Sequence, residues 1–228
     1  MRNKILVGLS AFTGALLVWN LYKIFYVLGD EQAQGAIWRI FQFHFPAGVL
    51  GLSGFVIATL FSMMYLVRND LRYDAIAAGI IEVSLVFAAI VLVTGSIWAR
   101  IIWGVWWAWD ARLTSMLVCW LIFSGYLMLR RAIAEPTQRA RLSAVVSIFG
   151  GIDSIIVWKS IEWYRGMHPG PVIDPRTGGG RMPELWQHTA YWNVLAMLCL
   201  AIILIMVRMR QEGYSREIDS LRRRAHAI

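Results

Sequence analysis

The chain has 228 residues, of which 58% are hydrophobic and 16% are charged. Soluble domains average about 45–50% apolar and about 25% charged residues. A disordered chain would be poor in aromatic side chains, whereas this chain has 12 tryptophans. Its net charge is +8. This charge is not evidence of nucleic-acid binding until it is known where the basic residues lie relative to a membrane. Composition therefore excludes a soluble or disordered chain and predicts a polytopic helical membrane protein.

Six apolar segments are long enough to cross a bilayer, which takes about 20 residues in a helix. They are residues 5–28, 46–67, 75–98, 111–129, 142–158 and 188–207. No small-residue cleavage site follows the first segment, so we expect a retained helix rather than a signal peptide. Pro46 is expected in the first turn of the second helix, where its missing N–H costs nothing. The predicted fold class is all-α, with six transmembrane helices in one membrane-embedded domain over residues 1–228.

The distribution of basic residues predicts the orientation of these helices. An even number of spans places both termini on one side. With the termini inside, 14 Lys and Arg residues lie in inner segments and seven in outer segments, with Lys23 in the first helix. The positive-inside rule then favours cytoplasmic termini. The outer loops would be residues 29–45, 99–110 and 159–187, the last being rich in Gly and Pro and therefore irregular.

Tryptophans are concentrated in the second outer loop, at Trp103, Trp106, Trp107 and Trp109. One interpretation is an interfacial aromatic belt, because tryptophan is enriched at headgroup depth. The other is an apolar platform with indole N–H donors at its edges, suited to a large planar ligand. Asp110, which follows, is either part of this site or only the N-cap of the fourth helix.

Three of the four histidines lie near the outer ends of helices or in an outer loop. They are His44, His168 and His188, whereas His226 lies in the basic tail. Two neutral imidazoles on opposite sides form a normal axial pair for haem iron. Arginines on the same side could pair with the carboxylates of an anionic ligand; these are Arg39, Arg112, Arg165 and Arg176.

Other chemistries have weaker support in the sequence. The motifs GxxxxGK[ST], GxSxG and HExxH are absent, which argues against a P-loop ATPase and two common hydrolase classes. Cys119 and Cys199 have no CxxC or CxxCH spacing and are interpreted as buried apolar residues, so no haem would be attached covalently. Glu82 and Asp153 are intramembrane carboxylates, either functional or packing residues. Two alternatives are an electron-transfer haem protein and a polytopic transporter that uses Glu82 and Asp153.

Residues 103–115 resemble the WGxWWxWDxRLTS signature of the tryptophan-rich WWD haem-handling proteins. Within that group, the chain most resembles the cytochrome c maturation protein C, or haem exporter protein C, family. The resemblance extends to the chain length, the six spans and the segments 39–47 and 160–168. In that family, the histidine before the proline and the histidine of the last outer loop are essential, which corresponds to His44 and His168.

The resemblance implies a haem-binding subunit of a cytochrome c maturation system rather than an enzyme. It implies non-covalent, transient binding of haem b at the periplasmic face of a bacterial inner membrane, a mitochondrial location being the less favoured one. The implied iron ligands are His44 and His168. The other implied haem-binding residues are Trp103, Trp106, Trp107, Trp109, Asp110, Arg39 and Arg112. The implied partners are a periplasmic haem chaperone (cytochrome c maturation protein E), a small single-span protein D, and ABC-type ATPase and permease subunits A and B.

Overall fold

The computed structural model describes residues 2–164, 166–170, 173–174, 179–180 and 182–225. Its long helices are α1 (Arg2–Tyr22), α2 (Phe41–Arg68), α3 (Leu71–Ile102), α4 (Ala111–Ala132), α5 (Pro136–Trp163) and α6 (Glu184–Ala225). Short elements are a π-helix η1 (Lys23–Val27), a 3-10 helix η2 (Ala36–Ile40), and two-residue strands β1 (Ile173–Asp174) and β2 (Gly179–Gly180), which pair antiparallel. Within these described ranges, six helical segments are long and apolar enough to cross a membrane. The predicted six-helix, all-α class is confirmed.

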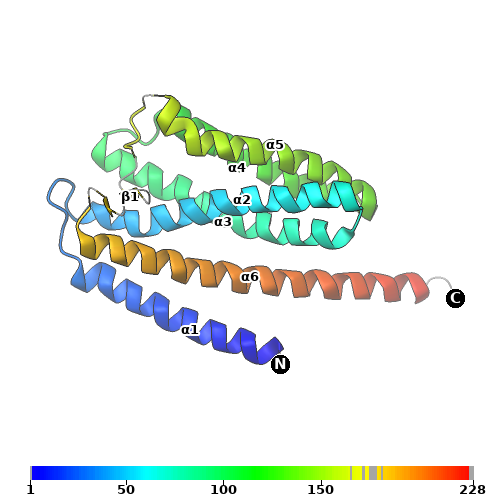
Figure 1. Ribbon diagram of the computed structural model, residues 1–228. Helices are drawn as coiled ribbons and strands as arrows, with labels where there is room; N and C mark the ends of the chain where they lie inside the picture. The colour runs from blue at the N-terminus through cyan, green and yellow to red at the C-terminus, as the bar shows by residue number, and fades with distance from the viewer. Residues whose placement is uncertain (1, 165, 171–172, 175–178, 181, 226–228) are drawn as a thin grey trace.

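The helices form an elongated bundle, with α2, α3, α4 and α5 packed together (Figure 1). Helix α6 lies along α2 and α3, and α1 packs against α6. The first turn of α1 and the last turn of α6 point toward the same end of the bundle, whereas the connections α1–α2, α3–α4 and α5–α6 lie at the other end (Figure 1). The three loops expected to form the outer surface are therefore close to one another.

Several helices extend into segments that the sequence analysis assigned to loops. Helix α3 continues to Ile102, α5 continues to Trp163, and α6 begins at Glu184. The hydropathy pattern marks only the apolar part of each helix, while hydrogen-bonded turns with polar residues continue beyond it. Asp110, Asp70 and Glu135 cap the starts of α4, α3 and α5 with their side-chain carboxylates.

The position predicted for Pro46 is wrong, because α2 begins five residues earlier at Phe41. Proline inside a helix cannot donate to the carbonyl four residues before it, which here belongs to Gln42. The side-chain amide of Asn193 on α6 donates to that carbonyl oxygen instead. The Gln42 side chain in turn donates to the Trp186 carbonyl at 3.2 Å. These two bonds join the first turns of α2 to α6 and satisfy the carbonyl that proline leaves free.

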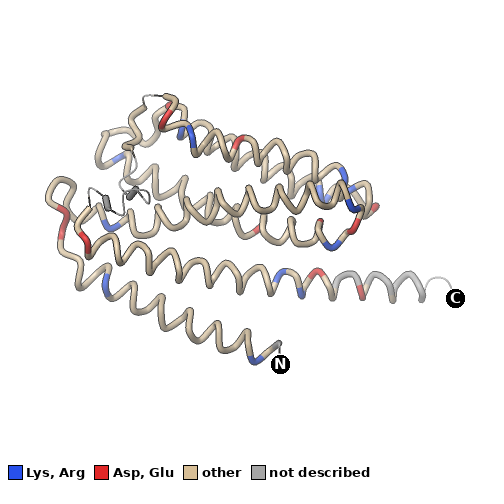
Figure 2. The backbone as a smooth tube through the Cα atoms, viewed as in Figure 1, with Lys and Arg blue, Asp and Glu red and all other residues tan. Residues whose placement is uncertain are grey.

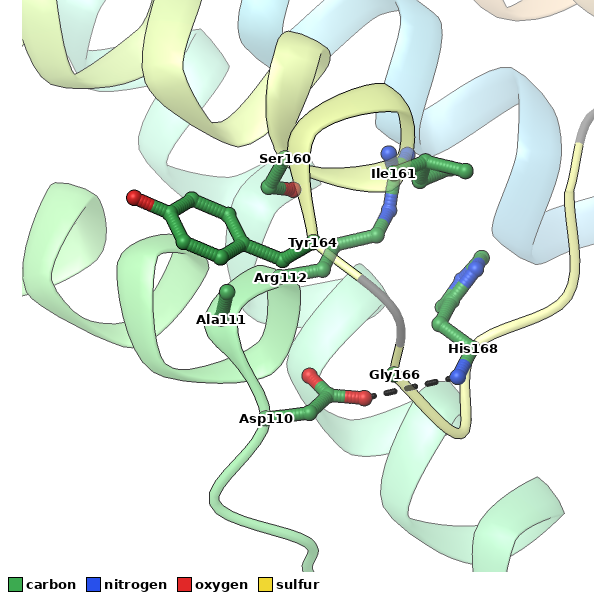
Figure 3. Close-up of a pocket in the computed structure, with 8 residues that line it drawn as sticks. All are labelled: Asp110, Ala111, Arg112, Ser160, Ile161, Tyr164, Gly166 and His168. Atoms are coloured by element: carbon green, nitrogen blue, oxygen red, sulfur yellow. Dashed lines mark hydrogen bonds between the residues drawn. The ribbon is translucent and has the colours of Figure 1, made fainter.

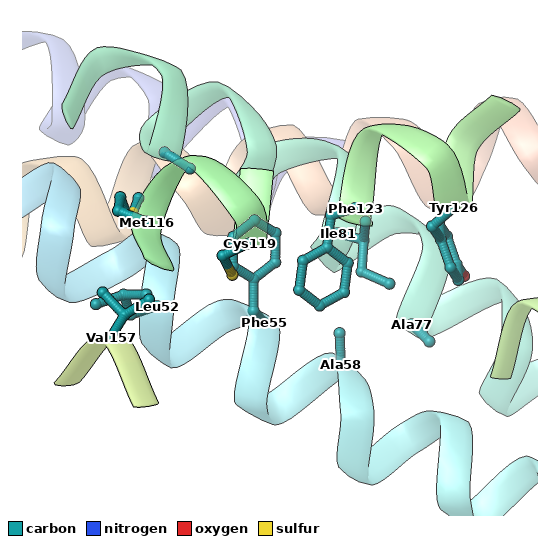
Figure 4. Close-up of a cluster of buried hydrophobic side chains, with 11 residues drawn as sticks. Leu52, Phe55, Ala58, Ala77, Ile81, Met116, Cys119, Phe123, Tyr126 and Val157 are labelled. Carbon is teal, nitrogen blue, oxygen red and sulfur yellow. The ribbon is translucent and has the colours of Figure 1, made fainter. Parts of the chain in front are cut away.

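The core of the bundle depends on aromatic stacking and on small residues. The Phe55 and Phe123 rings stack with their centroids 3.9 Å apart (Figure 4). A Cβ atom on Gly150 would come within 2.6 Å of the Phe123 ring, and one on Gly151 within 2.4 Å of Thr59. Close approach of helices at small residues is typical of membrane bundles, where association depends on packing.

Two carboxylates of α3 are paired with arginines of neighbouring helices, and Figure 2 marks the positions of the charged residues along the backbone. Arg130 of α4 donates to both carboxylate oxygens of the buried Asp74 on α3. Arg208 of α6 donates to both carboxylate oxygens of Glu82 on α3. Bidentate pairing neutralises each carboxylate. The sequence alone did not decide whether Glu82 is a functional or a packing residue. In the structure it is paired with Arg208.

We predict that Asn193→Leu destabilises the bundle, because the Gln42 carbonyl beside Pro46 then lacks a donor. A buried acceptor without a partner costs about 1–3 kcal/mol, which should appear as a lower thermal unfolding midpoint in detergent. The control is Ser143→Ala, because the Ser143 hydroxyl is buried and has no hydrogen-bond partner among the described residues. Equal midpoints for Asn193→Leu and Ser143→Ala would contradict this role.

Candidate functional site

His44 lies in the first turns of α2, where it faces α3. Its Nδ1 atom is 2.9 Å from the hydroxyl oxygen of Thr94. Its ring contacts Trp98 edge-on, with the centroids 5.9 Å apart and the planes at 86°. The imidazole is therefore held by α3 while it lies at the loop end of the bundle, as the sequence analysis expected for a histidine near an outer helix end.

The tryptophan-rich loop joins α3 to α4 and is partly open to the surroundings. Gly104 has a φ of +77°, a conformation that favours glycine, and its carbonyl accepts a hydrogen bond from Arg100. Trp106 and Trp109 are 61% and 78% exposed. The ring of Trp109 meets that of Trp107 edge-on at 5.9 Å, and the buried indole N–H of Trp107 has no acceptor among the described residues. This loop therefore offers apolar ring surface, and beneath it lies a buried indole donor that no described residue uses.

Asp110 connects the tryptophan-rich loop to the loop that carries His168. Its Oδ1 accepts from the Leu113 amide at 2.8 Å, which makes it the N-cap of α4. Its Oδ2 accepts from the His168 amide at 3.4 Å (Figure 3). Gly166 favours the close approach, since a Cβ atom there would lie 3.0 Å from Oδ2 and the Asp110 side chain would have to shift by a few tenths of an ångström. The N-cap interpretation is confirmed, and the same carboxylate also contacts the backbone of the second histidine.

His168 is partly buried, and its ring has a defined tautomer. Its Nδ1 lies 2.9 Å from the Pro169 carbonyl oxygen. A carbonyl oxygen only accepts, so Nδ1 carries the proton and Nε2 has a free lone pair. Burial, followed by the positive charge of Arg112, lowers the pKa of His168 to about 4. The imidazole is therefore neutral at pH 7, the form that binds a metal.

Arg112, in the first turn of α4, lies within electrostatic range of both His44 and His168. Its guanidinium donates to the Val157 carbonyl at 3.4 Å, a long bond. Among the residues that the structure describes, no carboxylate forms an ion pair with it. Asp110 is the carboxylate that acts on it electrostatically, but without a close ion pair among the described residues. A partly buried cation in this position is suited to an anionic ligand.

Arg39 has different neighbours. Its guanidinium donates to the Ile24 carbonyl at 3.0 Å, to the Leu28 carbonyl at 2.9 Å and to Asp30 at 2.7 Å. These bonds satisfy carbonyls at the end of η1 and attach it to η2. Contact of Arg39 with a bound ligand stays a prediction, and it would require exchange of at least one of these partners.

The remaining candidates do not join this group within the described residues. His188 lies on the first turns of α6, is exposed, and is 3.4 Å from the Glu184 carboxylate. Trp103 is partly buried at the end of α3. His226, Arg165 and Arg176 lie outside the described residues. Two residues of α3 beside His44, Thr94 and Gly95, were missed by sequence reasoning. A threonine and a glycine in an apolar helix carry no signal without the position of His44.

The pocket between α4, α5 and the His168 loop is small, at about 10 Å³ (Figure 3). This volume is close to that needed for one water molecule. Arg112, Tyr164 and His168 are among the residues that line it. This pocket, as the described residues form it, is too small to enclose a large planar ligand.

The fold and this site define a six-helix membrane protein with two histidines and a tryptophan-rich loop at one end of its bundle. The family model described as heme exporter protein C matches residues 1–224, and the chain belongs to that family. Similar proteins named heme exporter protein C include those of Bradyrhizobium diazoefficiens (32% identical, covering 97% of this chain and 83% of the relative), Escherichia coli K12 (30%, 79% and 72%) and Paracoccus denitrificans (28%, 95% and 88%). The resemblance that the tryptophan motif indicated is confirmed.

We predict that Asp110→Asn separates the two contacts of this carboxylate. An amide oxygen can still cap α4, but if it does so the NH₂ group faces the His168 amide and cannot accept from it. Hydrogen exchange of peptides covering 164–170 should become faster, while the free energy of unfolding stays within about 1 kcal/mol of wild type. Asp110→Ala should affect both quantities. Unchanged exchange in both variants would contradict the contact with His168.

Proposed function

We propose that this chain binds haem at the outer face of a bacterial inner membrane and delivers it to a periplasmic haem chaperone during cytochrome c maturation. The observation that carries the proposal is the grouping of His44 and His168 with Arg112, which forms no ion pair with any residue that the structure describes. Membership in the heme exporter protein C family supports haem as the cargo.

The two histidines would bind the iron from opposite faces of the porphyrin. Two protein ligands complete the coordination of haem iron, and among the described residues no three His, Cys, Asp or Glu gather as a separate metal site. The Nε2 atom of His168 carries the lone pair, because Nδ1–H is held by the Pro169 carbonyl, and Nε2 has no hydrogen-bond partner among the described residues. His44 is held between two helices, whereas His168 lies on a loop, so we assign the fixed ligand to His44 and the releasable ligand to His168.

The surrounding residues match the rest of a haem molecule. The guanidinium of Arg112 would pair with a propionate, with Arg39 as a second propionate partner. The rings of Trp103, Trp106, Trp107 and Trp109 would flank the macrocycle. Asp110 would hold the His168 loop against α4. The exposed rings of Trp106 and Trp109 suit transient, non-covalent binding of haem b, because a molecule bound against them remains accessible to the acceptor.

Delivery would involve other proteins, and we propose no catalytic step for this chain. The partners would be the haem chaperone (cytochrome c maturation protein E), a small single-span protein D, and ABC-type ATPase and permease subunits A and B. The sequence has no P-loop motif, so ATP hydrolysis would belong to the ATPase subunit.

Two other functions have less support. An electron-transfer cytochrome would place paired histidines deep within its helices, whereas His44 lies in the first turns of α2 and His168 in a loop. A transporter that uses intramembrane carboxylates would need Glu82 and Asp153 along a pathway, but Arg208 neutralises Glu82.

We predict that the purified protein binds haem with a Soret band that depends on His44 and His168. His44→Gly and His168→Gly should each weaken binding and shift the band, and added imidazole should restore it by filling the space of the lost side chain. His188→Gly is the matched control, because His188 is exposed on α6. Loss of the band in His188→Gly, with His168→Gly unchanged, would show that the assigned ligand is wrong.

We predict that His44, Trp107 and His168 face the periplasm, on the basis of the asymmetry of basic residues. Single cysteines at these positions and at the exposed Trp109 should react with a membrane-impermeant thiol reagent in intact spheroplasts. A cysteine at the exposed Tyr214 of α6 should react only in inverted vesicles. The native Cys119 and Cys199 are buried and give a low background. The reverse pattern would overturn the orientation.

A further inference from the structure

Three residues on one face of α3 surround the imidazole of His44. Thr94 is hydrogen-bonded to Nδ1 at 2.9 Å, and the Trp98 ring meets the imidazole edge-on at 5.9 Å. The indole N–H of Trp98 donates to the Gln34 side chain at 2.7 Å, which fixes that ring in turn. The third residue, Gly95, lies between them in the sequence and leaves space beside the ring.

The hydroxyl group of Thr94 has a single hydrogen, and α3 itself uses it. Thr94 Oγ1 lies 2.6 Å from the Ile90 carbonyl oxygen, one helical turn earlier. Since a carbonyl oxygen only accepts, the hydroxyl donates to Ile90 and can only accept from His44. The proton of the neutral imidazole must then be on Nδ1, which leaves the lone pair of Nε2 unshared.

Gly95 determines how closely the imidazole can approach α3. A Cβ atom at this position would lie 3.2 Å from His44 Cε1 and 3.8 Å from Nδ1. The first distance is shorter than ordinary van der Waals contact between carbon atoms. Any larger residue would push the ring away from Thr94 by a few tenths of an ångström.

We infer that Thr94 and Gly95 are positioning residues that fix the tautomer and the orientation of His44, so that Nε2 is the atom presented to the iron. This inference rests on the proposed haem-binding function. His168 is held in the same tautomer by the Pro169 carbonyl, so both histidines offer Nε2. Hydrogen bonding of the remote ring nitrogen is the usual way in which proteins orient a metal-binding histidine and raise its basicity.

The test begins with haem-free protein in nanodiscs, labelled with 15N-histidine. The nitrogen resonances of His44, identified by their loss in His44→Gln, report which ring nitrogen carries the proton. We expect Nδ1–H in the wild type and in Thr94→Ser, which keeps the hydroxyl, and a shift of the proton toward Nε2 in Thr94→Val. Thr13→Val is the matched control, because Thr13 makes the same bond to the carbonyl one turn earlier (Leu9, 2.8 Å) on α1.

Haem titration of the same variants supplies the second readout. Loss of a hydrogen-bond partner of a metal-binding histidine costs about 10- to 100-fold in affinity, which we expect for Thr94→Val but not for Thr94→Ser. Gly95→Ala should also weaken binding, whereas Gly125→Ala should not, because a Cβ atom on Gly125 meets no atom within 4 Å.

Two results would overturn the inference: a wild-type His44 protonated on Nε2, or a Thr94→Val variant that keeps both Nδ1–H and the wild-type haem affinity. A wild-type protein that binds no haem would instead contradict the proposed function. The tautomer measurement would still decide whether Thr94 fixes the ring, so the two failures are distinguishable.

Discussion

Two parts of the candidate site are joined by the hydrogen bonds of one carboxylate, that of Asp110, one of 2.8 Å and a longer one of 3.4 Å. One oxygen caps α4 and thereby ends the tryptophan-rich loop, and the other contacts the His168 amide. The second contact attaches the loop between α5 and α6 to the start of α4. Gly166 permits the approach because it has no Cβ atom. Local helix capping and the assembly of the site are therefore coupled at a single residue.

The two ends of the bundle use charge differently. The pairs Asp74–Arg130 and Glu82–Arg208 satisfy charges within the spans and join α3 to α4 and α6. In the apolar part of a bilayer an unpaired charge is expensive, so such pairs stabilise the arrangement of helices. Arg112, by contrast, forms no ion pair among the described residues, although it is partly buried beside two histidines. An unpaired cation of this kind favours a ligand that brings negative charge.

Much of the fold could be predicted from the sequence, because six apolar segments of sufficient length leave few alternatives in a membrane. The helix ends could not, since they depend on polar contacts made after packing. Pro46 is an example: it lies inside α2 because Asn193, 147 residues later, supplies the donor for the Gln42 carbonyl. The partner of Glu82 could not be predicted either, because Arg208 lies in the part of α6 that continues beyond the apolar segment.

The site was only partly predictable. The tryptophan motif and the two histidines were visible as residue types in the sequence, but the bonds of Arg39 to the end of η1 and the contacts of Thr94 and Gly95 with His44 arise from tertiary packing. The measurement that tests the central claim most directly is electron paramagnetic resonance of the ferric haem-loaded protein. Axial binding by His44 and His168 predicts a low-spin bis-imidazole signal that becomes high-spin in His168→Gly and returns with added imidazole. A low-spin signal that survives both His44→Gly and His168→Gly would contradict it.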